Sequence, residues 1–170
     1  MDRLDSFKDI VSSAMQAFLQ ENYEDSIVLF NRALSHQPAH RLSLLSRGSA
    51  FMRLSRLDDA RADFDRAIEA HPDHARAYHL RGLVKERQGD DSGAVADFDK
   101  AIGLDMDYGA AYASRASVHQ KLGHQDLAAR DMETVVALTK TNLETYGNEN
   151  NVLRSQHMVL EDALETELNR

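Results

Sequence analysis

Residues 47–68, RGSAFMRLSRLDDARADFDRAI, decide how this chain folds, because residues 81–102, RGLVKERQGDDSGAVADFDKAI, repeat their pattern 34 positions later. The same period returns in weaker form at 115–136 and, projected backward, at 14–34. A unit of this length cannot bury its apolar face alone and must stack on its neighbours. The repeat therefore predicts an elongated array that functions by binding.

Composition limits the class of protein. Apolar residues make up 42% of the 170 and charged residues 28%, as in folded domains, and two prolines among many helix-forming residues predict an all-α protein. Cysteine is absent, which excludes disulfides and thiolate metal sites and fits a cytoplasmic protein. No apolar run reaches the roughly 20 residues that span a bilayer. The net charge of −8 argues against sequence-independent binding of nucleic acid. We therefore expect a cytoplasmic protein whose partner is neither nucleic acid nor membrane.

Helix-breaking residues recur with the same period. Gly89 and Gly123 stand where the first helix of a hairpin would end in a left-handed conformation, and Pro38 and Pro72 stand at the joints between repeats. The pattern predicts four helical hairpins within residues 1–142. Their expected bounds are about 7–40, 41–74, 75–108 and 109–142.

Small and bulky residues alternate in a way that packs two helices together. Ala60, Ala94 and Ala128 allow close approach, while Phe30, Phe64 and Phe98 fill the space beside them. With these columns the chain resembles the tetratricopeptide repeat family. The second repeat supplies Leu44, Gly48, Phe51, Ala60, Phe64, Ala67 and Pro72 at that family's signature positions. The third departs at Lys85 and Met106, the fourth at Ala116, Met132 and Val135, and the first at Ser26.

The resemblance implies a right-handed superhelix whose first helices line a concave groove for an extended peptide or a partner helix. By register, the groove residues are Met15, Leu45, Ser49, Met52, Arg53, Arg76, His79, Leu83, Arg87, Ser117 and Lys121. Phe18 and Leu19 also face this way by register but could equally be hairpin core. The groove would be apolar at its N-terminal end and mostly basic further along, which suits hydrophobic anchors followed by acidic residues.

Some family members bind acidic chaperone tails through a clamp of lysine and asparagine residues. The positions of the asparagines hold Met15, Ser49, Leu83 and Ser117 here, and Val11 stands where that clamp has lysine. The clamp is therefore not present, and we do not expect binding of chaperone tails.

Arginine and aspartate occur together through the repeats. Arg47, Arg81 and Arg115 are followed at one constant spacing by Asp63, Asp97 and Asp131, and the first repeat has Ser13 and Leu29 at these two steps. These positions lie on facing helices of one hairpin. We therefore predict three structural ion pairs with bidentate geometry rather than a ladder of catalytic or ligand-binding charges.

After residue 142 the repeat pattern fails, and one apolar stripe takes its place. Leu143, Tyr146, Asn150, Leu153, His157, Leu160 and Leu164 follow one another at steps of three or four. This spacing predicts a C-terminal helix within 143–170. We expect it to cap the last repeat; the alternatives are that it projects and pairs with a second chain or a partner helix, or that it occupies the groove.

Chemistry is not indicated elsewhere. The His36/His40 and His71/His74 pairs lie at turns without further convergent ligands, and no phosphate-binding loop, nucleophile elbow or zinc-protease motif occurs. We therefore predict a protein that is not an enzyme and that has no metal and no cofactor. It would be an adaptor or scaffold binding another protein; the alternative is a module that self-assembles through its C-terminal helix or terminal repeat.

Overall fold

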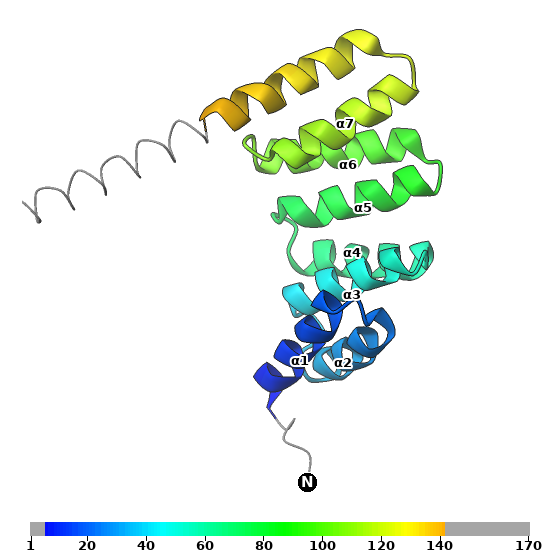
Figure 1. Cartoon of the computed structure of the whole chain (residues 1–170), viewed down its shortest axis with the longest axis vertical. Coiled ribbons are helices and arrows are strands. Elements are labelled where there is room, and N and C mark those ends of the chain that lie inside the picture. The colour runs from blue at the N-terminus through cyan, green and yellow to red at the C-terminus, as the bar shows by residue number, and fades with distance from the viewer. Residues whose placement is uncertain (1–5, 142–170) are drawn as a thin grey trace, which may run out of the picture.

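A computed structural model describes residues 6–141, which form eight helices and no strand. Seven of them are α1 (Phe7–Leu19), α2 (Tyr23–His36), α3 (Arg41–Arg53), α4 (Leu57–Ala70), α5 (Ala75–Arg87), α6 (Asp91–Leu104) and α7 (Gly109–Lys121). The eighth covers 125–141 and is called the 125–141 helix below. Consecutive helices pair as four hairpins that stack into a curved, all-α array (Figure 1). This architecture confirms the predicted fold; the C-terminal helix expected within 143–170 lies outside the described residues.

The first helices of the hairpins lie on the inner side of the curve. Helix α1 contacts α3, α3 contacts α5, and α5 contacts α7, whereas among these labelled helices no second helix contacts the next second helix. Stacking in which one row of helices is closer than the other must curve toward the closer row. The face lined by α1, α3, α5 and α7 is therefore the concave one.

One aromatic column forms the centre of the core. Phe30, Phe64 and Phe98 are fully buried. Gly48 and Gly82 pack directly on the second and third of these rings, since a Cβ atom added to Gly82 would lie 2.5 Å from Phe98 Cε1. A Cβ atom at Gly48 or Gly82 would therefore displace the phenylalanine ring from its present position.

The turn inside each hairpin needs a left-handed residue. Gly89 and Gly123 have φ values of +84° and +80°, as predicted, and the equivalent positions in the first two repeats hold Glu21 and Ser55 with φ values of 62° and 58°. Residues with a Cβ atom rarely adopt this conformation. The first two hairpins therefore make the same turn as the last two at the cost of backbone strain.

Candidate functional site: the concave face and its inter-repeat arginines

The three predicted arginines hold buried carboxylates within each hairpin. Arg81 donates from Nε and Nη2 to the two carboxylate oxygens of Asp97, at 2.8 and 2.7 Å. Arg47 and Arg115 contact Asp63 and Asp131 with the same bidentate geometry. The hydrogen bonds to Asp97 raise the pKa of Arg81, despite its partial burial. A buried carboxylate held in this way is a structural element and is not available to a ligand.

Each of these arginines also contacts the preceding repeat, which the sequence analysis did not predict. Arg81 Nη1 donates to Asp65 on α4 at 2.8 Å. Arg115 donates in the same way to Asp99 on α6, and Arg47 donates to the amide oxygen of Asn31 on α2. Arg47, Arg81 and Arg115 are called the staple arginines below, because each joins a hairpin to its neighbour. A signal was present in the sequence, since Asp65 and Asp99 are themselves one repeat of 34 residues apart.

The predicted groove residues divide by exposure. Arg53, Arg76, Arg87, Ser117 and Lys121 are exposed on the first helices, and Met15, Ser49 and Leu83 are partly buried. These eight side chains are therefore accessible on the first helices, as a role in the groove would require. Of the two residues whose role was left open, Phe18 packs against the core and Leu19 is exposed.

Three predicted groove residues are buried instead, and the prediction is corrected there. Leu45, Met52 and His79 each have an exposed fraction of 8%. Leu45 and Met52 belong to the core cluster because neighbouring first helices close over them. His79 is held by hydrogen bonds between Nε2 and Ser114 Oγ (2.9 Å) and between Nδ1 and Tyr108 Oη (3.0 Å). Leu45, Met52 and His79 therefore offer little accessible surface to a ligand.

The imidazole of His79 is kept neutral by its surroundings. Burial lowers its pKa to about 4, and the positive charge of Arg76 contributes in the same direction. The network of His79, Ser114 and Tyr108 ties the third repeat to the fourth. Sequence reasoning did not find this network, because the equivalent positions in the other repeats hold Val11, Leu45 and Ala113.

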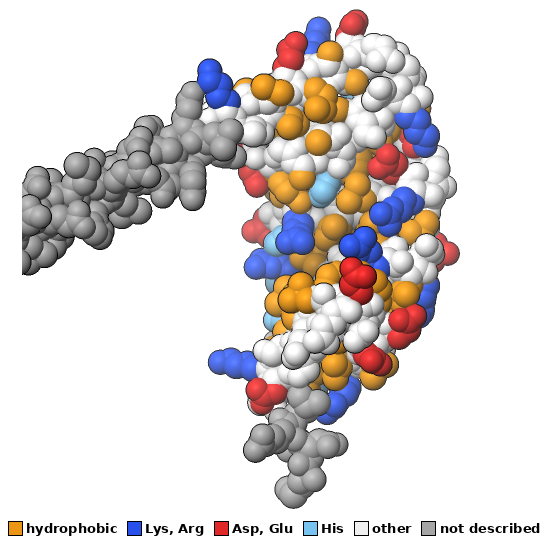
Figure 2. Space-filling view, in the orientation of Figure 1, with side chains coloured by type: hydrophobic (Ala, Val, Ile, Leu, Met, Phe, Trp, Pro, Cys, Tyr) orange, Lys and Arg blue, Asp and Glu red, His pale blue; other side chains and the backbone are white. Residues whose placement is uncertain are grey.

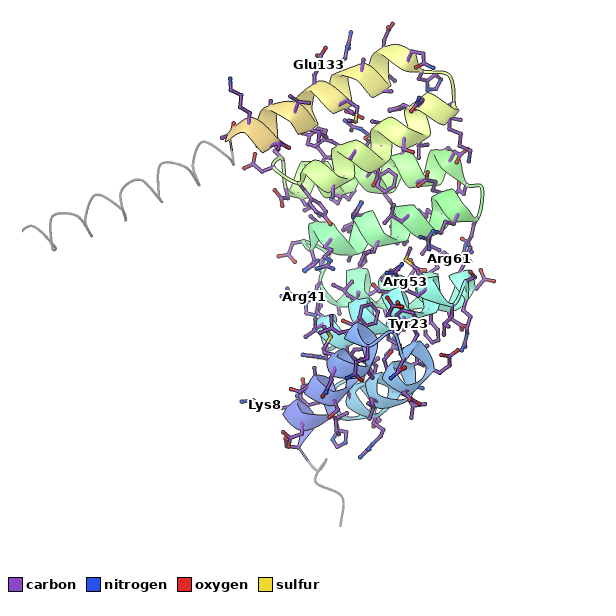
Figure 3. The ribbon with its side chains drawn as sticks, viewed as in Figure 1. Lys8, Tyr23, Arg41, Arg53, Arg61 and Glu133 are labelled. Atoms are coloured by element: carbon purple, nitrogen blue, oxygen red, sulfur yellow. The ribbon has the colours of Figure 1, made fainter. Side chains whose placement is uncertain are left out.

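The exposed cations of the concave face differ in their availability. Lys121 Nζ lies 2.6 Å from Asp91 Oδ1, so its charge is already paired. Arg53 lies over the ring of Tyr23, with Cζ 6.0 Å from the ring centroid, and the two side chains are seen together in Figure 3. Arg87 donates to the carbonyl oxygen of Met52 at 3.4 Å. Within residues 6–141, neither Arg53 nor Arg87 forms an ion pair with a carboxylate.

The described helices carry neither a metal cluster nor a membrane span. In the part of the chain that the structure describes, no three His, Cys, Asp or Glu side chains come together in a way that could hold a metal ion. None of the helices described is both long and apolar enough to cross a bilayer.

Comparison with known proteins identifies the family. A model of the tetratricopeptide repeat matches residues 13–68 and 45–109. The chain belongs to the tetratricopeptide repeat family, and its fold is that of a protein-interaction module. No curated protein sequence matches the chain significantly.

Solved structures with the same fold have low sequence identity. A crystal structure of MamA is 18% identical, with a TM-score of 0.77 over 84% of this chain and 83% of that one. A fragment of MamA from Desulfovibrio magneticus RS-1 is 18% identical, with a TM-score of 0.73 over 80% of this chain and 77% of that one. The first tetratricopeptide domain of Spaghetti (RPAP3), bound to the HSP90 peptide SRMEEVD, is 20% identical, with a TM-score of 0.66 over 69% of this chain and 93% of that one.

Proposed function

We propose that this protein is a non-catalytic adaptor that binds a peptide segment of another protein along its concave face. The observation that carries the proposal is the pair Arg53 and Arg87, which occupy the same repeat position at the ends of α3 and α5. Both are exposed and without a carboxylate partner among residues 6–141. Two cations in register along a groove suit acidic side chains or a carboxylate of an extended ligand.

Apolar surface lies beside these cations. Met15 and Leu83 are partly exposed on the same face, and Leu83 lies about one helical turn before Arg87 on α5. A ligand with apolar anchors and one or two acidic residues would therefore bury hydrophobic area and pair its charges at the same time. The fit favours an extended peptide, whose side chains can reach successive first helices.

The RPAP3 domain supports this use of the fold, because it is bound to a peptide that contains both a methionine and acidic residues. The peptide itself is not transferred to this chain. The clamp positions hold Met15, Ser49, Leu83 and Ser117 rather than asparagine, so we propose a different ligand. The absence of cysteine suits a reducing compartment, and we propose a cytoplasmic location.

The test is selection of peptides from a random library against the full chain, followed by titration calorimetry. Peptides that carry acidic residues beside apolar ones are expected, and Arg53→Glu/Arg87→Glu should weaken their binding by about tenfold or more. The matched control is Arg32→Glu/Arg130→Glu, which makes the same charge change at exposed positions on second helices. Equal losses in both variants would show that net charge, and not the groove, controls binding.

Self-assembly is the second candidate, and the exposed apolar residues of the last repeat favour it. Met132 and Val136 are 47% and 65% exposed. Light scattering on the full chain across a hundredfold range of concentration distinguishes the candidates. A monomer throughout supports the adaptor, whereas an oligomer that Met132→Asp converts to a monomer supports self-assembly.

A further inference from the structure

The last repeat presents a surface that is covered in every earlier repeat. Met132 stands in the column of Phe30, Phe64 and Phe98, which are completely buried, yet Met132 is 47% exposed. Between α7 and the 125–141 helix lies a depression of about 340 Å³, lined mainly by Ala113, Ala116, Ser117, Gln120, Ala128 and Met132. This surface, called the end face below, carries the apolar side chains gathered at the top of the array (Figure 2).

The contacts between consecutive repeats inside the array show what kind of helix packs against the surface that is equivalent to the end face. Helix α5 presents Ala77 and Val84, both fully buried, in the same cluster as Phe64 of the preceding repeat. Helix α7 repeats the arrangement, since Val118 packs in the cluster that contains Phe98. A staple arginine lies between the small residue and the valine. The first helix of each following repeat therefore carries a small residue, an arginine and an aliphatic residue at positions i, i+4 and i+7.

The end face retains the acid that such an arginine would contact. Glu133 occupies the column of Asp65 and Asp99, which accept hydrogen bonds from Arg81 and Arg115. Glu133 is exposed near the end of the array (Figure 3) and forms no ion pair with any described residue. The end face thus combines an apolar depression with the unpaired carboxylate of Glu133. It is complementary to a helix that carries an arginine beside apolar residues.

The sequence that follows residue 141 in this chain does not match the end face. Helices α2, α4 and α6 end at His36, Ala70 and Leu104, and the equivalent position is 138, but the 125–141 helix continues through 141. The turn that would direct the next segment onto the end face is therefore absent at the periodic place. In register, moreover, that segment would bring Glu149 to the staple position, against Glu133.

A second copy of the chain does not match either. The first helix of a stacked copy would be α1, which has Asp9, Ser13 and Gln16 at the three positions. It would bring no cation to Glu133 and would place a carboxylate where the inner joints have a small residue. The charge pattern thus disfavours end-to-end stacking of identical chains.

We propose that the end face binds a helix of a different protein, in which a small residue, an arginine and a valine or alanine stand at i, i+4 and i+7, and that the arginine pairs with Glu133. This surface shares Ser117 with the concave face but includes neither Arg53 nor Arg87. The proposal does not depend on the function proposed for the groove.

The experiment uses the full chain and a helical peptide, constrained by a lactam on its outward face, with the sequence of residues 75–87. This peptide carries the required pattern at Ala77, Arg81 and Val84. The readout is the set of ¹³C-methyl methionine signals, with that of Met132 assigned from Met132→Leu. The Met132 signal should shift to saturation, while the signal of Met15, which is partly exposed on α1, reports any binding in the groove.

Charge exchange provides the matched control. The Arg81→Glu version of the peptide should bind the wild-type chain at least about fivefold more weakly, and Glu133→Arg in the chain should reverse this preference. Equal affinities for both peptides, or no shift of Met132 at millimolar peptide, would overturn the proposal.

Two other results would assign a different occupant and would also overturn it. A shift of the Met132 signal caused by Val152→Asp in the absence of peptide would show that the chain's own C-terminal segment covers the end face. A shift that depends on protein concentration alone would show that a second copy does so.

Discussion

Replacing Arg81 by methionine tests whether the staple arginines hold the array together. The substitution keeps much of the apolar stem and removes the hydrogen bonds to Asp97 at 2.8 and 2.7 Å and to Asp65 at 2.8 Å. The Asp97 side chain is only 6% exposed, so its charge stays buried with Lys85 Nζ, 2.9 Å away, as its remaining cation. Removing one partner of a buried ion pair lowers the free energy of unfolding by about 3–5 kcal/mol. Because Lys85 remains beside Asp97, we expect Arg81→Met to lower it by about 3 kcal/mol.

Urea unfolding followed by far-ultraviolet circular dichroism measures this cost. For a chain of this size the loss corresponds to a fall in Tm of roughly 6–12 °C. If the free energy of unfolding falls with urea concentration at the same slope in the variant and the wild type, the variant unfolds like the wild type. The matched control is Asp65→Asn, which removes only the charge of the half-exposed contact, since an amide oxygen can still accept as that of Asn31 does from Arg47, and it should cost less than about 1 kcal/mol.

A double variant separates the two origins of the loss. Arg81→Met combined with Asp97→Leu removes the buried carboxylate and its arginine partner and leaves Lys85, which is partly exposed to solvent, and it should recover at least half of the stability lost in Arg81→Met. If Arg81→Met costs no more than Asp65→Asn, the reasoning about the buried carboxylate is refuted.

Three other predictions concern the turns, the core and the pH dependence. Ser55→Gly should raise the free energy of unfolding by about 1 kcal/mol because it relieves a left-handed residue, and Gly89→Ala should lower it by a similar amount; urea unfolding that gives the same sign for both would contradict this. Gly82→Ala should destabilise by about 1–3 kcal/mol, since the new Cβ would lie 2.5 Å from Phe98 Cε1, and the combination with Phe98→Leu should restore part of the loss in the same assay. Burial lowers the pKa of His79 in the folded state to about 4, below the 6.5 of an unfolded histidine. As the pH falls, the unfolded chain therefore binds a proton at this residue before the folded chain does. The free energy of unfolding should fall as the pH drops from about 6.5 to 4. Unfolding of His79→Leu over this range should show a smaller fall, and an identical pH profile would contradict the assignment.

The repeat period was sufficient to predict the hairpins because each repeat places small and bulky residues at matching steps. A small residue and a phenylalanine in register define both which helices pair and how closely, as Gly82 and Phe98 show. The left-handed conformation of Ser55 was not predicted, because serine gives no signal for it in the sequence.

The site was less accessible to sequence reasoning. Register assigns residues to the concave side, but it does not say how far neighbouring first helices close over them, and so Leu45 and Met52 were placed on the surface although they are buried. Spacing within one repeat indicated the contact of Arg81 with Asp97, on the second helix of the same hairpin. The contact with Asp65, on the preceding hairpin, depends on how two repeats stack, which no single repeat determines.

The staple arginines also rank the joints of the array by strength. Arg81 and Arg115 each reach back to a carboxylate on the preceding hairpin, whereas Arg47 reaches back to the neutral amide of Asn31. A carboxylate adds to the hydrogen bond a Coulomb attraction for the guanidinium that the neutral amide lacks. The inter-repeat arginine therefore holds the first hairpin less tightly than the third and fourth, and high salt concentration, which screens half-exposed charges, should weaken the later two joints more than the first.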